Sequence, residues 1–362
     1  MVNMAVVKQN NYHDEQNRQN VLKMRAVLET LPPFCKTFFR GIEEYTSART
    51  RLAYAYDIRL FFEYLHEQNA LYAKMEIKDF PLSLLDQLTR LDIEEYLEYM
   101  SLYQKDGKDI TNAERGKSRK LAALRSFYNY FYRSELIANN PAALVSLPKL
   151  HDKEIIRLEP NEVAILLDQV EDGTKLTKKE LEYHKKTKIR DVALLTLLLG
   201  TGIRVSECVG LDLQDVNFDV CGIKIRRKGG YEAVVYFGDE VETALLDYLE
   251  EREQVIPLTG HENALFLSLQ NRRITVRAVE NLVKKYASRV TTIKKITPHK
   301  LRSTYGTTLY QETGDIYLVA DVLGHKDVNT TRKHYAALQD ERRRRAAQYV
   351  QLREKPSTDP KT

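Results

Sequence analysis

The sequence predicts a two-domain, mainly α-helical protein with one small antiparallel β-sheet in its second domain. Apolar residues recur at helical spacing through most of the 362 residues. One stretch, residues 218–237, alternates in the manner of strands on either side of a Gly-Gly pair. A polar connector with a proline, residues 147–154, separates two segments that are each long enough to bury a core.

The first domain is expected to be helical over residues 26–148. Residues 1–25 are polar and are expected to form a tail or a first helix. Ser47 is the predicted N-cap of a helix that runs to Leu65 with its apolar residues at helical spacing. Further helices are predicted at residues 91–103 and 112–136, the latter ending near Asn139-Asn140-Pro141.

The second domain is placed at residues 159–350, after a linker at 149–158 and before a C-terminal tail at 351–362. Pro160 suits the first turn of a helix. Residues 172–188 are strongly charged and predict a surface insertion, whereas residues 190–199 predict a buried helix. Two strands are expected around Gly229-Gly230. The remaining helices are predicted at residues 240–254, 275–288, 298–312 and 316–323 and from 329 onward.

Composition limits the classes of protein that fit. The formal charge is +5 and the pI about 8.8, so clusters of cations matter more than the total. Three scattered cysteines, Cys35, Cys208 and Cys221, argue against a disulfide framework and against a zinc site. The first fifteen residues lack the apolar core of a signal peptide, and the longest apolar run, residues 192–199, is too short for a bilayer. We therefore expect a cytoplasmic protein without a membrane partner.

A tyrosine near the C-terminus and five cations before it suggest the chemistry. The six residues are Arg204, Lys228, His299, Arg302, His325 and Tyr335. A tyrosine oxygen is a poor nucleophile at neutral pH because its pKa is near 10. Cations around it would help it to ionise and would also hold a phosphodiester. This combination predicts covalent chemistry on a nucleic-acid backbone without a metal or a cofactor.

Each residue type suits one step of such a reaction. Two guanidinium groups, Arg204 and Arg302, can clamp the non-bridging phosphate oxygens. His299 lies three positions before Arg302 and so shares its helix face. Lys228, at the tip of the predicted hairpin, can protonate a leaving 5′ oxygen.

His325 follows a glycine at a predicted reversal and can donate a hydrogen bond to the phosphate. Tyr335 would attack and become a phosphotyrosine. Taken singly, these residues are also typical of solvated charges, edge-protecting lysines or packed tyrosines. Gly200-x-Gly202 follows a helix and lacks a third glycine, so it does not predict dinucleotide binding. The absence of clustered acidic ligands gives a two-metal nuclease little support.

In their order and spacing these residues resemble the tyrosine recombinase (lambda integrase) family. The anchors are residues 200–207 with Arg204, the hairpin lysine, His299-Lys300-Leu301-Arg302, Leu323-Gly324-His325 and Tyr335. The similarity covers roughly residues 47–349. Within the family, the chain is most similar to the Xer branch and its XerS-like type, which resolves chromosome dimers with a single protein.

The resemblance implies a helical, SAM-like core-binding domain followed by a catalytic domain, closed around double-stranded DNA. It implies a homotetramer on paired sites and strand exchange through a Holliday junction. It leaves open whether a DNA translocase controls the reaction. It also implies that His299 assists proton transfer and that Glu207 supports the phosphate site. Residues 336–350 resemble a C-terminal helix that docks onto a neighbour.

Two positions depart from the family pattern. Tyr335 lies ten positions after His325, one more than in many members. The family lysine usually stands between two glycines, whereas Arg227 precedes Lys228 here. Lys224 is a weaker alternative because it is farther from the turn.

Two segments of the first domain are candidates for contacting the duplex. The six basic residues are Arg49, Arg51, Lys117, Arg119, Lys120 and Arg125. Most cations on such helices contact phosphates and position the protein without reading sequence. For residues 342–345, a solvated or partner-facing stripe is the favoured interpretation.

Other functions share these features. A type IB topoisomerase uses the same chemistry, although a separate N-terminal helical domain favours a recombinase. A DNA-binding protein with decayed catalysis would also fit, but all six catalytic residue types are present. Among recombinases, a mobile-element integrase remains an alternative to chromosome dimer resolution. The absence of an obvious arm-binding domain favours the latter.

Overall fold

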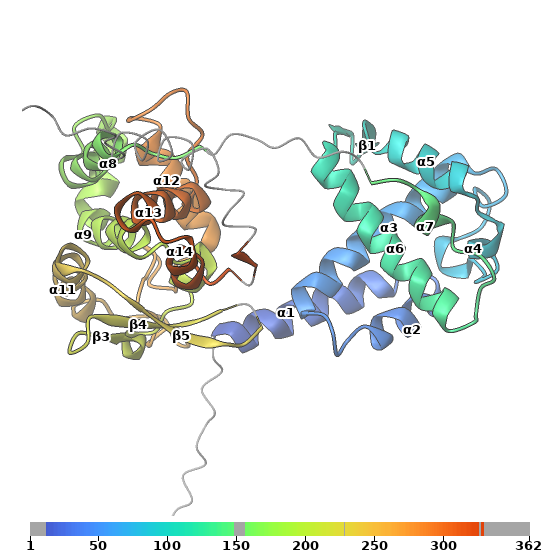
Figure 1. Cartoon of the computed structure of the whole chain (residues 1–362), viewed down its shortest axis with the longest axis horizontal. Helices are drawn as coiled ribbons and strands as arrows, with labels where there is room; N and C mark the ends of the chain where they lie inside the picture. The colour runs from blue at the N-terminus through green and yellow to red at the C-terminus, as the bar shows by residue number, and fades with distance from the viewer. Residues whose placement is uncertain (1–11, 148–155, 228, 326, 329–362) are drawn as a thin grey trace, which may run out of the picture. The chain divides into compact units, whose positions relative to one another are not determined.

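The chain divides into two units after Lys153, within the connector that the sequence predicts (Figure 1). The structure, a computed structural model, describes residues 12–147, 156–227, 229–325 and 327–328. Helices dominate both units, so the prediction of a mainly α fold is confirmed. In the described part of the chain, no helix is long and apolar enough to cross a membrane.

The first unit is built from helices around one apolar core. In chain order they are α1 (Tyr12–Leu28), α2 (Pro33–Gly41), α3 (Ala48–Gln68), η1 (Ile77–Asp79), α4 (Leu84–Gln87), α5 (Arg90–Tyr99), α6 (Glu114–Arg133) and α7 (Pro141–Leu144). Ser47 caps α3 as predicted, because its hydroxyl accepts the backbone N–H of Thr50 at 3.2 Å. Edge-to-face contacts join Phe38 of α2 to Phe127 and Tyr130 of α6, which fixes α2 against α6.

The N-terminal segment is helical where it is described. Residues 12–25, which the domain boundaries placed in a tail, belong to α1. Met24, Val27 and Leu28 are buried, and α1 packs along α3. The low overall apolarity of this segment hid its short buried stripe. The alternative prediction, a first helix, therefore describes residues 12–28.

A second β-hairpin lies in the first unit, where the sequence predicted a helix to residue 103. Strands β1 (Tyr103–Lys105) and β2 (Lys108–Ile110) pair antiparallel. Asp106 and Gly107 connect them with φ of 51° and 69°. Asp-Gly suits a two-residue turn that needs positive φ at both positions. This hairpin was not predicted from the sequence, because its strands are short and polar.

The second unit surrounds one long buried helix, α9 (Lys178–Thr201). The other helices are α8 (Pro160–Asp172), α10 (Val205–Cys208), η2 (Leu213–Asp215), α11 (Asp239–Glu253), α12 (Val276–Ala287), α13 (Pro298–Thr313) and α14 (Ile316–Val322). Helices α8, α11 and α13 pack directly on α9, as the arrangement in Figure 1 shows. The predicted buried run is confirmed, because Ala193, Leu195 and Leu198 are 0–1% exposed.

The charged segment 172–188 is not a surface insertion. It contains the end of α8, a short loop and the first half of α9. His184 is buried, and its Nε2 lies 2.8 Å from the carbonyl oxygen of Val170. Thr187 is buried and donates to Asp191 at 3.0 Å. The charges lie on the outer face of a helix whose inner face is packed.

The predicted hairpin is present and belongs to a three-stranded antiparallel sheet. Its strands are β3 (Val216–Asn217), β4 (Gly222–Arg226) and β5 (Glu232–Tyr236), in that order. Ile223 and Ile225 are buried, whereas Lys224 and Arg226 are exposed, as their alternation predicts. The turn carries Gly229 and Gly230, both at positive φ. The sheet therefore places residue 227 at the end of β4, just before that turn.

Candidate active site

The loop after α9 places Arg204. Helix α9 ends at Gly202, whose φ is 62°, and a Cβ on that glycine would lie only 2.4 Å from Cδ1 of Tyr305. Arg204 follows directly as the N-cap of α10. The buried carboxylate of Glu207 accepts both the backbone N–H of Arg204, at 2.7 Å, and its Nη1, at 2.8 Å. Glu207 thereby fixes the plane of the guanidinium group.

Helix α13 supplies Arg302 and His299. Arg302 is only 6% exposed and donates through Nη1 to the carbonyl oxygen of Gly202 at 2.5 Å. Its Nη2 donates to the carbonyl oxygen of Leu323. His299 lies one turn earlier and is exposed. The two residues lie near the start of the same helix, one reaching into the unit and one at its surface.

His325 follows a tight turn at the end of α14. The backbone N–H of His325 donates to Ala320 at 2.9 Å, and Gly324, with φ of 59°, makes the reversal. The carbonyl groups of residues 321–324 form what is called here the α14 carbonyl end; that of Asp321 also accepts the backbone N–H of Gly324 at 2.8 Å. Arg204 donates through Nη2 to the carbonyl oxygen of Gly324 at 3.3 Å. The structure thus brings Arg204, Arg302 and the backbone next to His325 together.

Arg227 completes this arrangement, and the sequence analysis did not assign it a role. It lies at the end of β4 and donates through Nη1 to Asp321 O at 3.2 Å and through Nη2 to Val322 O at 2.8 Å. Three guanidinium groups from three elements therefore bind four successive carbonyl groups. Cations are favoured at a helix C-terminus, where the backbone dipoles present partial negative charge. The only sequence signal was the basic residue in place of the expected glycine before Lys228.

Two members of the predicted set, Lys228 and Tyr335, lie outside the described residues, as do residues 336–350. The alternative lysine, Lys224, is exposed and pairs with Glu232 on the neighbouring strand at 2.8 Å. The hydrogen bond that Lys224 donates to the Glu232 carboxylate raises the pKa of Lys224. A general acid works best with a pKa near the working pH, so this environment does not favour Lys224 in that role.

Of the six candidate DNA-contacting residues in the first unit, five have described contacts with protein groups. Arg49 is exposed, and Lys117 is half-buried with its Nζ 2.5 Å from the hydroxyl of Ser101. Arg51 is buried against the carbonyl groups of Glu43 and Thr46, at 2.8 and 2.9 Å.

The other three also contact protein groups. Arg125 donates to the carbonyl groups of Ala142 and Val145. Arg119 and Lys120 both pair with the buried carboxylate of Asp57. These partners are distant in sequence, so helical periodicity alone could not identify them.

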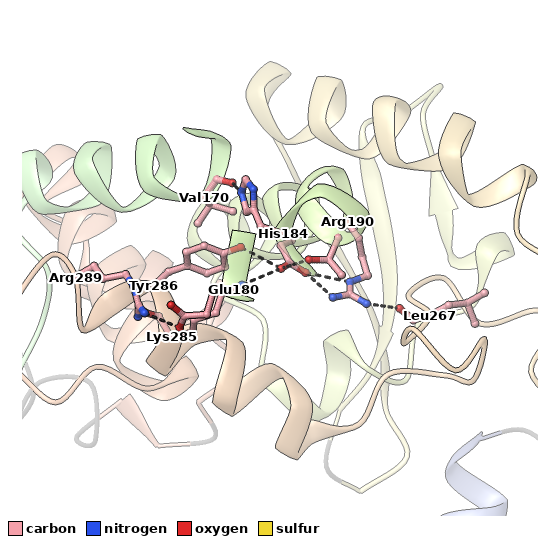
Figure 2. Close-up of polar contacts among 10 residues, drawn as sticks. Val170, Glu180, His184, Arg190, Leu267, Lys285, Tyr286 and Arg289 are labelled. Carbon is pink, nitrogen blue, oxygen red and sulfur yellow. Dashed lines mark hydrogen bonds and ion pairs between the residues drawn. The ribbon is translucent and has the colours of Figure 1, made fainter. Parts of the chain in front are cut away.

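A second cluster of polar groups, which includes Arg190, Lys285 and Tyr286 (Figure 2), lies inside the second unit and is centred on the buried Asp191. Its members, called the Asp191 cluster, are Thr187, Arg190, Asp191, Lys285 and Tyr286. Arg190 binds the carboxylate through Nη2 at 2.6 Å and the carbonyl oxygen of Leu267 through Nη1 at 2.9 Å. Tyr286 donates to the carboxylate at 3.2 Å. The cluster joins α9 to α12 and to the loop before it.

Burial shifts the pKa values of two members of this cluster, Lys285 and Tyr286. Desolvation lowers the pKa of Lys285 although Asp191 opposes that shift. Desolvation and the carboxylate of Asp191 together raise the pKa of Tyr286. This tyrosine is therefore a neutral hydrogen-bond donor at physiological pH. In the described part of the chain, no group of His, Cys, Asp and Glu residues has an arrangement that could hold a metal ion.

Comparison with known proteins agrees with this fold. Residues 157–342 match the phage integrase family. Tyrosine recombinase XerC of Caldanaerobacter subterraneus subsp. tengcongensis is 33% identical over 313 residues, which cover 83% of this chain and 82% of that protein. Tyrosine recombinase XerC of Listeria welshimeri is 34% identical over 291 residues, covering 79% and 86%.

A solved structure of the XerH site-specific recombinase bound to palindromic difH substrate, a post-cleavage complex, has the same fold. Its TM-score is 0.63 at 18% identity, and the match covers 95% of this chain and 98% of that one. The chain belongs to the phage integrase family, and it is a tyrosine recombinase of the XerC/XerD type. The resemblance inferred from the sequence is therefore confirmed at the level of the family.

Proposed function

We propose that this protein recombines double-stranded DNA at a specific, dif-like site and thereby resolves chromosome dimers, acting as a homotetramer on two paired sites. The observation that carries the proposal is the convergence of Arg204 and Arg302 beside His325. The acceptors described for Arg302 are the carbonyl oxygens of Gly202 and Leu323, which fix where its guanidinium group lies. Positive charge held in a partly buried turn suits a phosphodiester.

The proposed reaction conserves the number of phosphodiester bonds. The phenolic oxygen of Tyr335 attacks the phosphorus and loses its proton, with His299 assisting the transfer. A 3′-phosphotyrosyl bond forms, the bond from phosphorus to the 5′ oxygen breaks, and Lys228 gives that oxygen a proton. The 5′ hydroxyl of a partner strand then attacks the phosphotyrosine, which releases Tyr335 and joins the strands. No external energy is required because each bond replaces an equivalent one.

The basic residues of the first unit would hold the duplex. Arg49 and Lys117 are the best placed, because Arg49 is exposed and the contact described for Lys117 is with the hydroxyl of Ser101. Arg51 and Arg125 are engaged by backbone carbonyl groups and would contribute mainly by shaping these helices. Affinity for DNA should fall steeply as salt rises. The dif-like target is supported by the named XerC relatives and by the XerH structure bound to difH.

The test is a covalent trap on nicked duplexes that carry either a candidate site from the chromosome terminus or a site selected for binding by the full-length chain. The wild-type chain should form a covalent adduct, and Tyr335→Phe should bind the same duplex without forming one. An adduct with Tyr335→Phe would remove the assignment of the nucleophile. Arg204→Ala and Arg302→Ala should retain most affinity for the duplex and lose cleavage.

A relaxation assay separates recombination from topoisomerase activity. A plasmid that lacks a paired site should keep its supercoils in the presence of the wild-type chain. A plasmid with two sites should yield recombinant products. Relaxation without a site would contradict the proposal and favour a type IB topoisomerase.

A further inference from the structure

Arg227 lies between two parts of the candidate site. On one side it belongs to the end of β4, where its backbone N–H donates to the carbonyl oxygen of Tyr231 at 2.7 Å across the turn. On the other side its guanidinium group binds the carbonyl groups of Asp321 and Val322. The next residue in the sequence is Lys228, the proposed general acid. One side chain therefore links the start of the lysine turn to the helix end that precedes His325.

The guanidinium group of Arg227 packs closely against the backbone of Gly324. A Cβ placed on Gly324 would lie 2.2 Å from Nη1 of Arg227 and 2.5 Å from its Cζ. The guanidinium group thus lies against the backbone of Gly324, and no side chain fits between them. A lysine offers one ammonium group instead of a planar fork and cannot reproduce two diverging donors in this space.

Arg227 also differs from Arg204 in which of its nitrogens remain available to a substrate. Arg204 is 36% exposed at its side chain, so it can also meet a substrate. Arg227 uses both terminal nitrogens on backbone oxygens. Its position therefore fits a residue that acts through others.

We propose that Arg227 is a positioning residue that holds the β4–β5 turn on the α14 carbonyl end, so that Lys228 meets the leaving oxygen while His325 meets the phosphate. The inference rests on the proposed function and adds a residue to it. Loss of Arg227 should impair protonation of the leaving group first. Loss of general acid catalysis slows a reaction by about 10²–10⁴-fold.

A 5′-bridging phosphorothiolate substrate isolates this effect. Sulfur replaces the leaving 5′ oxygen, and a thiolate leaves without a proton because thiols have pKa values near ~8.5. Adduct formation is measured in single turnover with full-length chains on matched oxygen and sulfur duplexes of the selected site. Arg227→Ala should be slower than wild type by at least about tenfold on oxygen and should recover most of that loss on sulfur. Lys228→Ala should behave in the same way.

Arg252→Ala is the matched control. Like the half-buried Arg227, the buried Arg252 donates to backbone carbonyl groups, those of Glu262 and Ala264, but it lies on α11. Any loss in that variant should be equal on oxygen and sulfur, because it arises from stability alone. Arg227→Lys provides a milder change in case Arg227→Ala does not fold, and it should show the same oxygen-specific loss. Thermal unfolding of each variant identifies the folded ones.

The outcomes separate the two proposals. If the wild-type chain forms no adduct on either substrate, the proposed function fails and the role of Arg227 fails with it. If wild type and Lys228→Ala behave as expected but both Arg227 variants match wild type on oxygen, only the positioning role is overturned. An equal loss on oxygen and sulfur in the folded Arg227 variants would also overturn it, because it would assign Arg227 to the fold or to the phosphate.

Discussion

The α14 carbonyl end and the Asp191 cluster both bind cationic side chains in the second unit, but they differ in the acceptor groups that these side chains meet. At the α14 carbonyl end, the acceptors described for Arg227 and Arg302 are backbone oxygens. In the Asp191 cluster, Arg190 and Lys285 face a buried carboxylate. A carbonyl group orients a guanidinium group without cancelling its charge, whereas a carboxylate cancels it. The two places also differ in exposure. The side chain of Arg204, although paired with Glu207, is 36% exposed and can meet an anion, whereas Arg190 and Asp191 are 13% and 2% exposed and mainly hold helices together.

Removal of the carboxylate from the Asp191 cluster should have the largest effect on the fold. Asp191→Ala leaves Arg190 and Lys285 without their anion in a buried place, which typically costs about 3–5 kcal/mol of stability. Denaturant unfolding of the full chain measures it. Asp219→Ala, at an exposed position, is the matched control and should change stability by less than about 0.5 kcal/mol. Similar losses of stability in the two variants would contradict the structural role of the Asp191 cluster.

Replacing one arginine by lysine at the α14 carbonyl end and one in the Asp191 cluster compares how much each region contributes to activity. Arg204→Lys keeps the charge but loses the fork, so we expect cleavage to fall by about 10²–10³-fold with little change in affinity for DNA. Arg190→Lys should instead lower stability and leave the cleavage rate of the folded enzyme close to that of wild type. Single-turnover cleavage and thermal unfolding measure both. The reverse pattern would show that the Asp191 cluster serves catalysis.

The turn that delivers Arg204 should depend on a residue without a side chain. Gly202→Ala forces alanine to adopt positive φ and pushes its Cβ against Tyr305, which should cost about 1–3 kcal/mol. Cleavage should fall further than stability predicts, because Arg204 moves with the turn. Gly238→Ala is the control: its φ is −96° and no atom lies near the added Cβ. An alanine at position 202 that preserves both properties would contradict this role.

The smallest expected effect concerns the N-terminus of α9. The backbone N–H and hydroxyl of Thr177 lower the pKa of Glu180 to about 2, with help from Arg289. A depressed pKa means that this stabilisation is complete above pH 4.5 and is lost as the pH falls toward 2. Glu180→Gln should cost about 1 kcal/mol at neutral pH, and the difference from wild type should shrink across that window. Glu182→Gln, at an exposed position of the same helix, is the control at neutral pH and should change stability by less than about 0.5 kcal/mol.

Local sequence patterns predicted much of the fold. The cap at Ser47, the buried stretch of α9 and the alternation of Ile223 and Ile225 follow from spacing and residue type, and all three are confirmed. The first half of α9 was missed because its outer face is densely charged. The hairpin at Asp106-Gly107 was missed because its strands are only three residues long.

By itself, the sequence determined which residue types are present, in what order, and the family to which the chain belongs. Only the tertiary structure decided which groups these residues bind. Arg227 meets Val322 across 95 positions and Arg204 meets Gly324 across 120. Both acceptors are backbone carbonyl groups, which every residue carries. No residue pattern can mark them, and they become specific partners only when helix α14 ends beside these arginines.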